Sequence, residues 1–210
     1  MGGMQLTDVV KNLLIINVLL FFGTTTLMGD IERAALALFY FEGDYFRPWQ
    51  IATHFFMHSN FNHLLFNMMT LVFLGPALEN YLGAKRFLIY YFLTAMGASI
   101  LHTVVQYYEL HYMGNGGIMV SSAWGASGAI YGVMVGFAMK FPNTKLGLLF
   151  IPVQIPAKIF VLLIIAWDLF AGLGSLNTGI AHFAHLGGAL AGFLLIRYWE
   201  KHSNHNRWDR

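Results

Sequence analysis

Four polar residues in the apolar parts of the chain could do chemistry together. Ser127 lies in the segment GASG, His185 lies in AHLGG, and His63 and Asn67 begin and end HLLFN. A histidine beside a serine can take the hydroxyl proton while the oxygen attacks a carbonyl carbon. These residue types therefore predict nucleophilic catalysis, provided that the fold brings them together.

The same part of the sequence offers the hydrogen-bond donors that such a reaction needs. A tetrahedral oxyanion is stabilised by preorganised donors, and the candidates are His63, the Asn67 amide and the backbone N–H of Ser127 at a predicted helix start. Tyr131 follows Ser127 by one helical turn, so we expect its ring to stack on His185 and fix that imidazole. Each of these residues, taken alone, also fits a structural role in helix packing.

The composition places these residues in a membrane protein. Of the 210 residues, 57% are hydrophobic and only 10% are charged, which is less than half the usual charged fraction. Apolar runs long enough to cross a bilayer lie at 12–28, 62–83, 86–108, 124–140, 157–173 and 179–199. We predict an all-α membrane protein: a six-helix membrane domain over residues 1–200 and a short polar cytoplasmic tail over 201–210.

The distribution of Lys and Arg predicts the orientation, because cytoplasmic loops carry an excess of both. With a cytoplasmic N-terminus, only Arg33 and Arg47 of the twelve lie outside. Both termini are then cytoplasmic, and the four polar residues lie near the outer ends of spans two, four and six, so the site opens outward. Because no targeting segment or extra domain is recognisable, we expect a prokaryotic plasma (inner) membrane.

Two stripes of small residues predict which helices pack most closely. Their four-residue spacing lets helix backbones approach in lipid. The stripes are Gly128, Gly132 and Gly136 in the fourth span and Ala184, Gly188 and Gly192 in the sixth. If the stripes face each other, Ser127 and His185 come within hydrogen-bond reach.

At these positions the sequence resembles the rhomboid family of intramembrane serine proteases. The resemblance extends over the predicted six-helix bundle. It is carried by HLLFN at 63–67, GPALENYLG at 75–83, GASG at 125–128 followed by Tyr131, and AHLGGALAG at 184–192. The glycines of GASG, Gly125 and Gly128, count as supporting residues for Ser127.

The resemblance implies an intramembrane serine endopeptidase that cleaves transmembrane substrates near their outer ends. Its catalytic dyad would be Ser127 and His185, with no acidic third member, and His63 and Asn67 would serve the oxyanion hole. The expected partners are the lipid bilayer and transmembrane protein substrates. No cofactor, metal or nucleic-acid partner is expected, and the oligomeric state stays open.

The long first loop, residues 29–61, carries one departure from the family pattern. Its many aromatic residues predict segments lying in the interfacial zone, and the resemblance places it half-sunk beside the bundle. Many relatives have Trp-Arg where this chain has Trp49-Gln50. Arginine offers five donors and glutamine only two, so we expect a more loosely held loop that Gln50→Arg would tighten, unless aromatic packing already anchors it.

Another class of protein fits the histidines: a polytopic metal-binding or transport protein. Five of them fall on or near the outer layer: His54, His58, His63, His182 and His185. No H-E-x-x-H motif is present, no carboxylate accompanies these histidines within their segments, and the absence of cysteine excludes thiolate ligands. An inactive relative would be expected to lack the serine or the histidine of the dyad.

Two carboxylates and two histidines have predicted roles outside the dyad. Asp168 in the fifth span could orient His185, form a structural hydrogen bond elsewhere or lie near the outer rim. Glu79 is expected to cap or pair with neighbouring loop groups. His54 and His58 are expected to brace the first loop.

Overall fold

The computed structural model describes residues 5–148, 151–174 and 181–203. Residues 175–180, which cover most of the predicted loop 174–178 and the first two residues of the predicted span 179–199, and residues 204–210 of the predicted polar tail lie outside the described residues. The last described helix continues through Lys201 to Ser203.

Long helices occupy all six positions at which the sequence predicts spans. They are α1 (Asp8–Leu27), α4 (Phe61–Leu82), α5 (Ala84–Met113), α6 (Ser127–Lys140), α7 (Ala157–Leu173) and α8 (His182–Ser203). By length and composition, α1, α4 and α5 are each able to cross a membrane. The prediction of a mainly helical membrane protein is confirmed, whereas six membrane-crossing helices remain a prediction.

Some boundaries differ from the predicted ones for local reasons. Helix α5 continues to Met113 and stops at Gly114, whose left-handed backbone (φ 69°) ends the helix. Helix α6 begins at Ser127, because Gly125 just before it has φ 113°. Ser127 is therefore the first residue of its helix.

The connections contain short elements that the sequence pattern did not predict. In the first loop these are α2 (Asp30–Ala34), β1 (Leu38–Phe39), α3 (Gln50–Thr53) and the 3-10 helix His54–Phe56; later come a 3-10 helix (Gly116–Val120), β2 (Ser122–Ala123), β3 (Lys145–Leu148) and β4 (Ile151–Pro156). Strand β1 pairs antiparallel with β2, and β3 pairs antiparallel with β4. The first pair ties the first loop to the segment that leads into Ser127.

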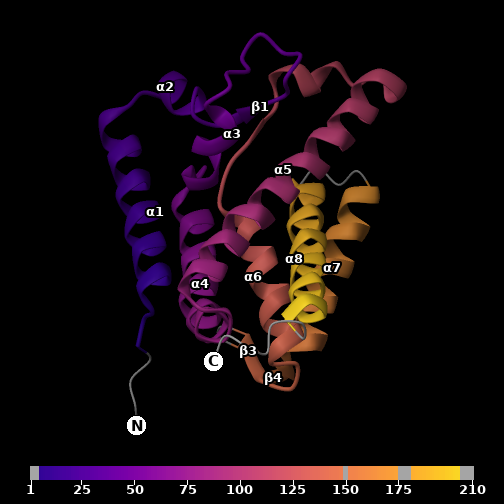
Figure 1. Cartoon of the computed structure of the whole chain (residues 1–210). Coiled ribbons are helices and arrows are strands. Elements are labelled where there is room, and N and C mark those ends of the chain that lie inside the picture. Colours follow the sequence, from indigo (N-terminus) through magenta and orange to yellow (C-terminus); the bar gives the residue numbers. More distant parts are fainter. Residues whose placement is uncertain (1–4, 149–150, 175–180, 204–210) are drawn as a thin grey trace.

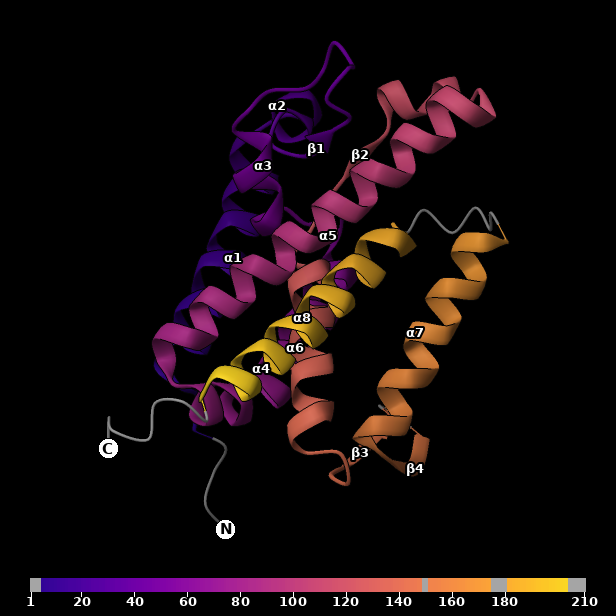
Figure 2. The ribbon, with the colours of Figure 1, turned by 45° about the vertical axis from the view of Figure 1, so that its right-hand side comes forward.

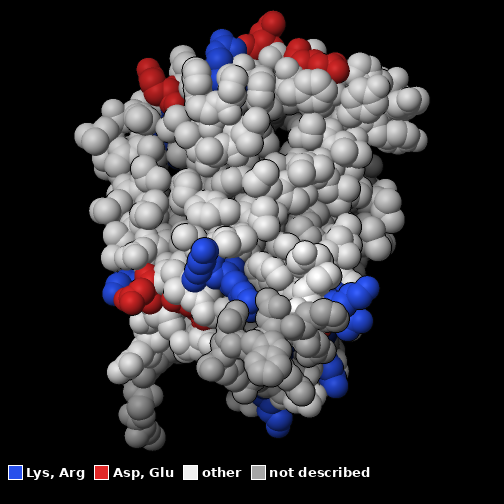
Figure 3. All heavy atoms as spheres, in the orientation of Figure 1, with Lys and Arg blue, Asp and Glu red and all other residues white. Residues whose placement is uncertain are grey.

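Helix α6 lies in the middle of the bundle and packs against α4, α5 and α8 (Figure 1). Helices α1 and α7 flank the bundle on opposite sides, α1 against α4 and α7 against α8 (Figure 2). The first loop covers the end of the bundle opposite to the start of α1 and the end of α8. On the face shown in Figure 3, charged side chains gather at these two ends and leave an uncharged band between them.

The predicted contact between the glycine stripes of α6 and α8 is confirmed. A Cβ at Gly188 would lie 2.0 Å from the Gly128 carbonyl oxygen, and one at Gly192 would lie 3.0 Å from the Gly132 Cα. The backbones touch there, and no side chain larger than hydrogen fits. Gly136 does not follow the pattern, because a Cβ there would meet Tyr90 and a leucine of α4 instead of α8.

The first loop is anchored by Gln50, which the expectation of a loosely held loop did not take into account. The Gln50 side chain is fully buried. Its Oε1 accepts from the backbone N–H groups of Phe39 (3.3 Å) and Arg47 (3.1 Å), and its Nε2 donates to the carbonyls of Ala35 (3.3 Å) and Tyr45 (3.0 Å). The loop presents both donors and acceptors to this position. An amide can satisfy both kinds, whereas a guanidinium can only donate.

Glu79 caps a helix, as expected from its position near a loop. Its carboxylate accepts from the Thr7 hydroxyl and from the backbone N–H groups of Val9 (3.1 Å) and Val10 (2.9 Å). The first N–H groups of a helix lack partners within the helix. Glu79 of α4 therefore holds the start of α1.

Candidate active site

Gly125 shapes the approach to Ser127. Its N–H donates to the carbonyl of His54 (3.0 Å), and its backbone has a φ that side-chain-bearing residues rarely adopt. A Cβ on Gly125 would lie 2.6 Å from Cε1 of His63. The glycine therefore lets the imidazole of His63 lie against the chain two residues before the serine.

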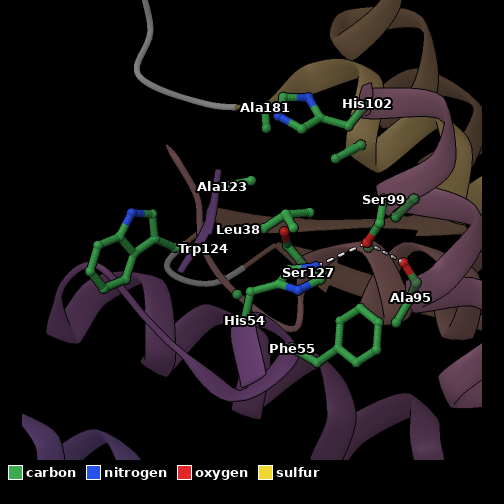
Figure 4. A pocket seen from close by; sticks show the side chains of 14 residues that line it. Leu38, His54, Phe55, Ala95, Ser99, His102, Ala123, Trp124, Ser127 and Ala181 are labelled. Atoms are coloured by element: carbon green, nitrogen blue, oxygen red, sulfur yellow. Dashed lines mark hydrogen bonds between the residues drawn. The ribbon is translucent and has the colours of Figure 1, made fainter. Parts of the chain in front are cut away.

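Ser127 is the first residue of α6 and lines a small cavity of about 30 Å³ (Figure 4). As the first helical residue, it has a backbone N–H without a partner inside the helix. His54 also lines the cavity, and its ring contacts the Gln50 carbonyl (2.5 Å) and the Ser99 hydroxyl (2.9 Å). The site thus joins the first loop, α5 and the start of α6.

His185 is held by the predicted stack on Tyr131. The two ring centroids lie 4.2 Å apart with an interplanar angle of 15°. Since Tyr131 follows Ser127 by one turn of α6, the stack places His185 of α8 against the first turns of α6. Only 12% of the His185 side chain is exposed.

The structure has no hydrogen bond between the side chains of Ser127 and His185. Both residues belong to the described part of the chain, and Gly128 lies against α8 next to them. Hydrogen bonds between catalytic groups are often long before substrate binds and tighten in the reacting complex. The expectation that these two side chains come within hydrogen-bond reach is therefore not confirmed and stays a prediction.

His63 and Asn67 share one face of α4, as predicted. His63 Nδ1 lies 3.2 Å from the Ser59 hydroxyl, and its other ring edge faces Gly125. Asn67 is buried, with 6% of its surface exposed, and its Nδ2 has no hydrogen-bond acceptor among the described residues. A buried amide donor without a partner is rare in a folded protein.

Asp168 reaches the site from α7. One carboxylate oxygen, Oδ1, lies 2.5 Å from Nδ1 of His182 and 3.3 Å from Nδ1 of His185. The Asp168 side chain is 3% exposed. Of the roles that the sequence left open, contact with His185 and a structural hydrogen bond to another group, His182, are both observed.

Asp168, His182 and His185 also have the spacing of a metal site. One potential ligand atom from each lies within 4.8 Å of the others. The segments of the two histidines contain no carboxylate, and the fold supplies one from another helix. His54, His58 and His63 do not belong to this group.

His54 and His58 act as braces, as expected. His58 accepts a hydrogen bond from Arg33 through its carbonyl (3.3 Å), and its ring packs edge-on against His63, with centroids 5.1 Å apart. Burial lowers the pKa of both His54 and His58 to about 4. Both rings are therefore neutral near pH 7, which suits structural rather than charge-carrying roles.

Sequence reasoning did not single out several residues that line the cavity beside Ser127. They are Leu38, Ser99, His102, Ala123 and Trp124. Ser99 and His102 lie three residues apart within a predicted span. Two polar residues so close together in an apolar span indicate a polar site, and this pattern could have identified them. Leu38 and Ala123 pair with each other in the β1–β2 ladder, which no local pattern predicts.

Comparisons with known proteins match most of the chain. A family model described as the rhomboid domain matches residues 45–201. The mitochondrial rhomboid protein 1 of Saccharomyces cerevisiae is 34% identical over 146 residues, covering 70% of this chain and 40% of the yeast protein. The YdcA protein of Bacillus subtilis is 35% identical over 152 residues, covering 70% and 65%. The rhomboid protease AarA of Providencia stuartii is 28% identical over 158 residues, covering 70% and 54%. The chain thus spans less than two thirds of the length of each of these relatives.

Proposed function

Because the chain belongs to the rhomboid family, we propose that it is an intramembrane serine endopeptidase with Ser127 as nucleophile and His185 as general base. It hydrolyses peptide bonds in or near transmembrane segments of membrane-protein substrates. The observation that carries the proposal is the stack of His185 on Tyr131, one helical turn from Ser127. A relative named as a rhomboid protease supports the same reaction class.

The proposed reaction begins with attack of Ser127 Oγ on the carbonyl carbon of the scissile bond. The hydroxyl proton passes to Nε2 of His185, and the carbonyl electrons move to the oxygen. When the C–N bond breaks, His185 gives that proton to the leaving amine. Water then repeats the attack and releases the serine.

The oxyanion would be held by three donors: the backbone N–H of Ser127, the Asn67 amide and the imidazole of His63. The Asn67 Nδ2 is a buried donor with no acceptor in the described part of the chain, which is the state expected of a donor that binds a developing negative charge. His63 lies against Gly125, two residues from the nucleophile. These contacts support the assignment.

Helix length supports a site below the membrane surface. The 14 residues of α6 extend about 21 Å at about 1.5 Å per residue, which is shorter than a hydrocarbon core of about 30 Å. In the proposed six-span topology, with the inner end of α6 at the cytoplasmic boundary, Ser127 then lies within the outer half of the bilayer. The site opens toward the outer face of a plasma (inner) membrane.

Hydrolysis at that depth requires water, and a second cavity offers a route. It has a volume of about 470 Å³ and lies next to the site. Its lining includes His102, Gln106, Glu109, Ser121 and His182. His102 also lines the cavity beside Ser127, so the two cavities adjoin at this side chain.

The alternative, a metal-binding or transport protein, is less well supported. The metal-like group of Asp168, His182 and His185 already has hydrogen bonds between the carboxylate and both rings. His54 and His63 belong to separate contacts around Gly125. The family match favours proteolysis.

Labelling with a serine-reactive fluorophosphonate tests the proposal. We expect stable labelling of the wild type in detergent, none in Ser127→Ala, and unchanged labelling in Ser122→Ala, whose hydroxyl only accepts from Trp124 (2.8 Å). On a model transmembrane substrate, Ser127→Ala and His185→Ala should lose similar activity, and the double variant little more. Absence of labelling in the wild type, or near-normal cleavage by His185→Ala, would contradict the proposal.

A further inference from the structure

Asp168 is a buried carboxylate that the two-residue mechanism does not use. It is the only acidic residue of α7, and its neighbours Trp167 and Leu169 are exposed, at 57% and 45%. Asp168 itself is 2% exposed. An ionisable group that faces inward from an otherwise apolar helix is expensive in a membrane and marks a functional position.

The carboxylate is shared between the two histidines of α8. His182 and His185 are three residues apart, so both rings project from one side of the helix. Each presents Nδ1 to the same oxygen, Oδ1 of Asp168, at 2.5 Å and 3.3 Å. A carboxylate only accepts hydrogen bonds, so an Nδ1 that bonds to it carries a proton.

Stacking and hydrogen bonding constrain His185 in complementary ways. The stack on Tyr131 fixes the plane of the imidazole, but a ring can still turn within that plane by changing its torsion angles. A bond from Nδ1–H to Asp168 fixes which edge points to α7. The opposite edge, Nε2, is then unprotonated and available to Ser127.

We propose that Asp168 is a positioning residue for His185, so that the working unit is Ser127, His185 and Asp168 instead of a dyad alone. This inference rests on the proposed function above. When His185 takes the proton from Ser127, the ring becomes a cation, and the carboxylate stabilises it without taking up a proton itself. The short contact with His182 keeps Asp168 in place while this happens.

The resting distance of 3.3 Å between Asp168 and His185 agrees with this role. The bond is long for a charge-assisted hydrogen bond, which is usually about 2.7–2.9 Å. A positive charge on His185 would strengthen its attraction to Oδ1. The contact therefore contributes most in the transition state, which is where an interaction accelerates a reaction.

The first test compares Asp168→Asn with Asp44→Asn, the same substitution at an exposed position of the first loop. An asparagine can offer its own N–H₂ to Nδ1 and so favour the wrong tautomer of His185. We expect Asp168→Asn to slow fluorophosphonate labelling of Ser127 and to lower kcat by about 10- to 100-fold. KM and melting temperature should stay near the wild-type values, and Asp44→Asn should behave as wild type.

A merely structural role for Asp168 would give a different pattern. Melting temperature would fall, and labelling would fall only in proportion to the folded fraction. That result, or wild-type labelling by Asp168→Asn, would overturn the inference while leaving the proposed function intact. If the wild type itself were not labelled, the proposed function would fail instead.

A second measurement does not depend on the variant folding or on proteolysis. In wild-type protein with ¹⁵N-labelled histidine, ring-nitrogen chemical shifts distinguish a protonated from an unprotonated Nδ1, and the His185 signals are those missing in His185→Gln. We expect His185 to be protonated on Nδ1 and unprotonated on Nε2 at neutral pH. A proton on Nε2 with a bare Nδ1 would overturn the inference.

Discussion

At the scale of single residues, the most informative atom is the amide nitrogen of Asn67. It is buried, and no described residue accepts from it; leaving a buried donor unsatisfied costs about 1–3 kcal/mol. Asn17 offers a direct contrast, because its Nδ2 donates to the Leu13 carbonyl (2.8 Å). The Nδ2 of Asn17 is thus satisfied, although its Oδ1 has no partner among the described residues, whereas the unpaired Nδ2 of Asn67 costs stability unless something binds to it.

Removal of the Asn67 amide should therefore affect turnover and not stability. We expect Asn67→Ala to lower kcat by about 10- to 1000-fold, with a melting temperature equal to or above that of the wild type. The matched control, Asn17→Ala, should lose melting temperature but keep the kcat of its folded fraction. Parallel loss of kcat and melting temperature in Asn67→Ala would instead make it a structural residue.

At the scale of elements, the sequence predicts helices better than the contacts made by loops. Long apolar runs predict where the six long helices lie, although within the described residues only three of them, α1, α4 and α5, are long and apolar enough to match the thickness of a bilayer. The glycine spacing predicts the contact between α6 and α8, because only close backbones require it. The β1–β2 ladder and the bond between Asp168 and His182 join distant segments, and no local pattern encodes them.

Gln50 shows why loop energetics could not be predicted from residue type. The sequence comparison counted donors, and arginine has more of them. The structure shows that the loop also needs two acceptor contacts, which Oε1 of Gln50 supplies to Phe39 and Arg47. The need for an acceptor at this position follows from the placement of the two N–H groups, which only the folded structure gives.

The direction of the Gln50→Arg effect is therefore reversed from the sequence-based expectation. The substitution would place a charge in a fully buried site and leave two N–H groups without an acceptor. We expect a loss of about 1–3 kcal/mol in stability and faster amide exchange over residues 47–60. Gln154→Arg, at an exposed position of β4, should leave that exchange unchanged. Slower exchange in Gln50→Arg would show that the loop has free carbonyls after all.

At the scale of the whole molecule, charge is distributed along the axis of the bundle. Arg33 and Arg47 belong to the loop at one end, and most of the other described Lys and Arg residues lie toward the opposite end, where α1 begins and α8 ends (Figures 1 and 3). The β3–β4 hairpin, which contains Lys145, lies at the second end. Since cytoplasmic loops carry the excess of positive charge, this asymmetry supports an orientation with the first loop and the proposed site toward the outer face.

Single cysteines can test this orientation, because the chain has no native cysteine. Asp44 in the first loop and Gly147 in β3 are both exposed, and a side chain at Gly147 would meet nothing within 4 Å. In intact cells, a membrane-impermeant maleimide should label Asp44→Cys and should label Gly147→Cys only after detergent is added. Both variants should label equally in detergent, which controls for reactivity. The opposite pattern in intact cells would turn the site toward the cytoplasm, and substrates would then be cleaved near their cytoplasmic ends.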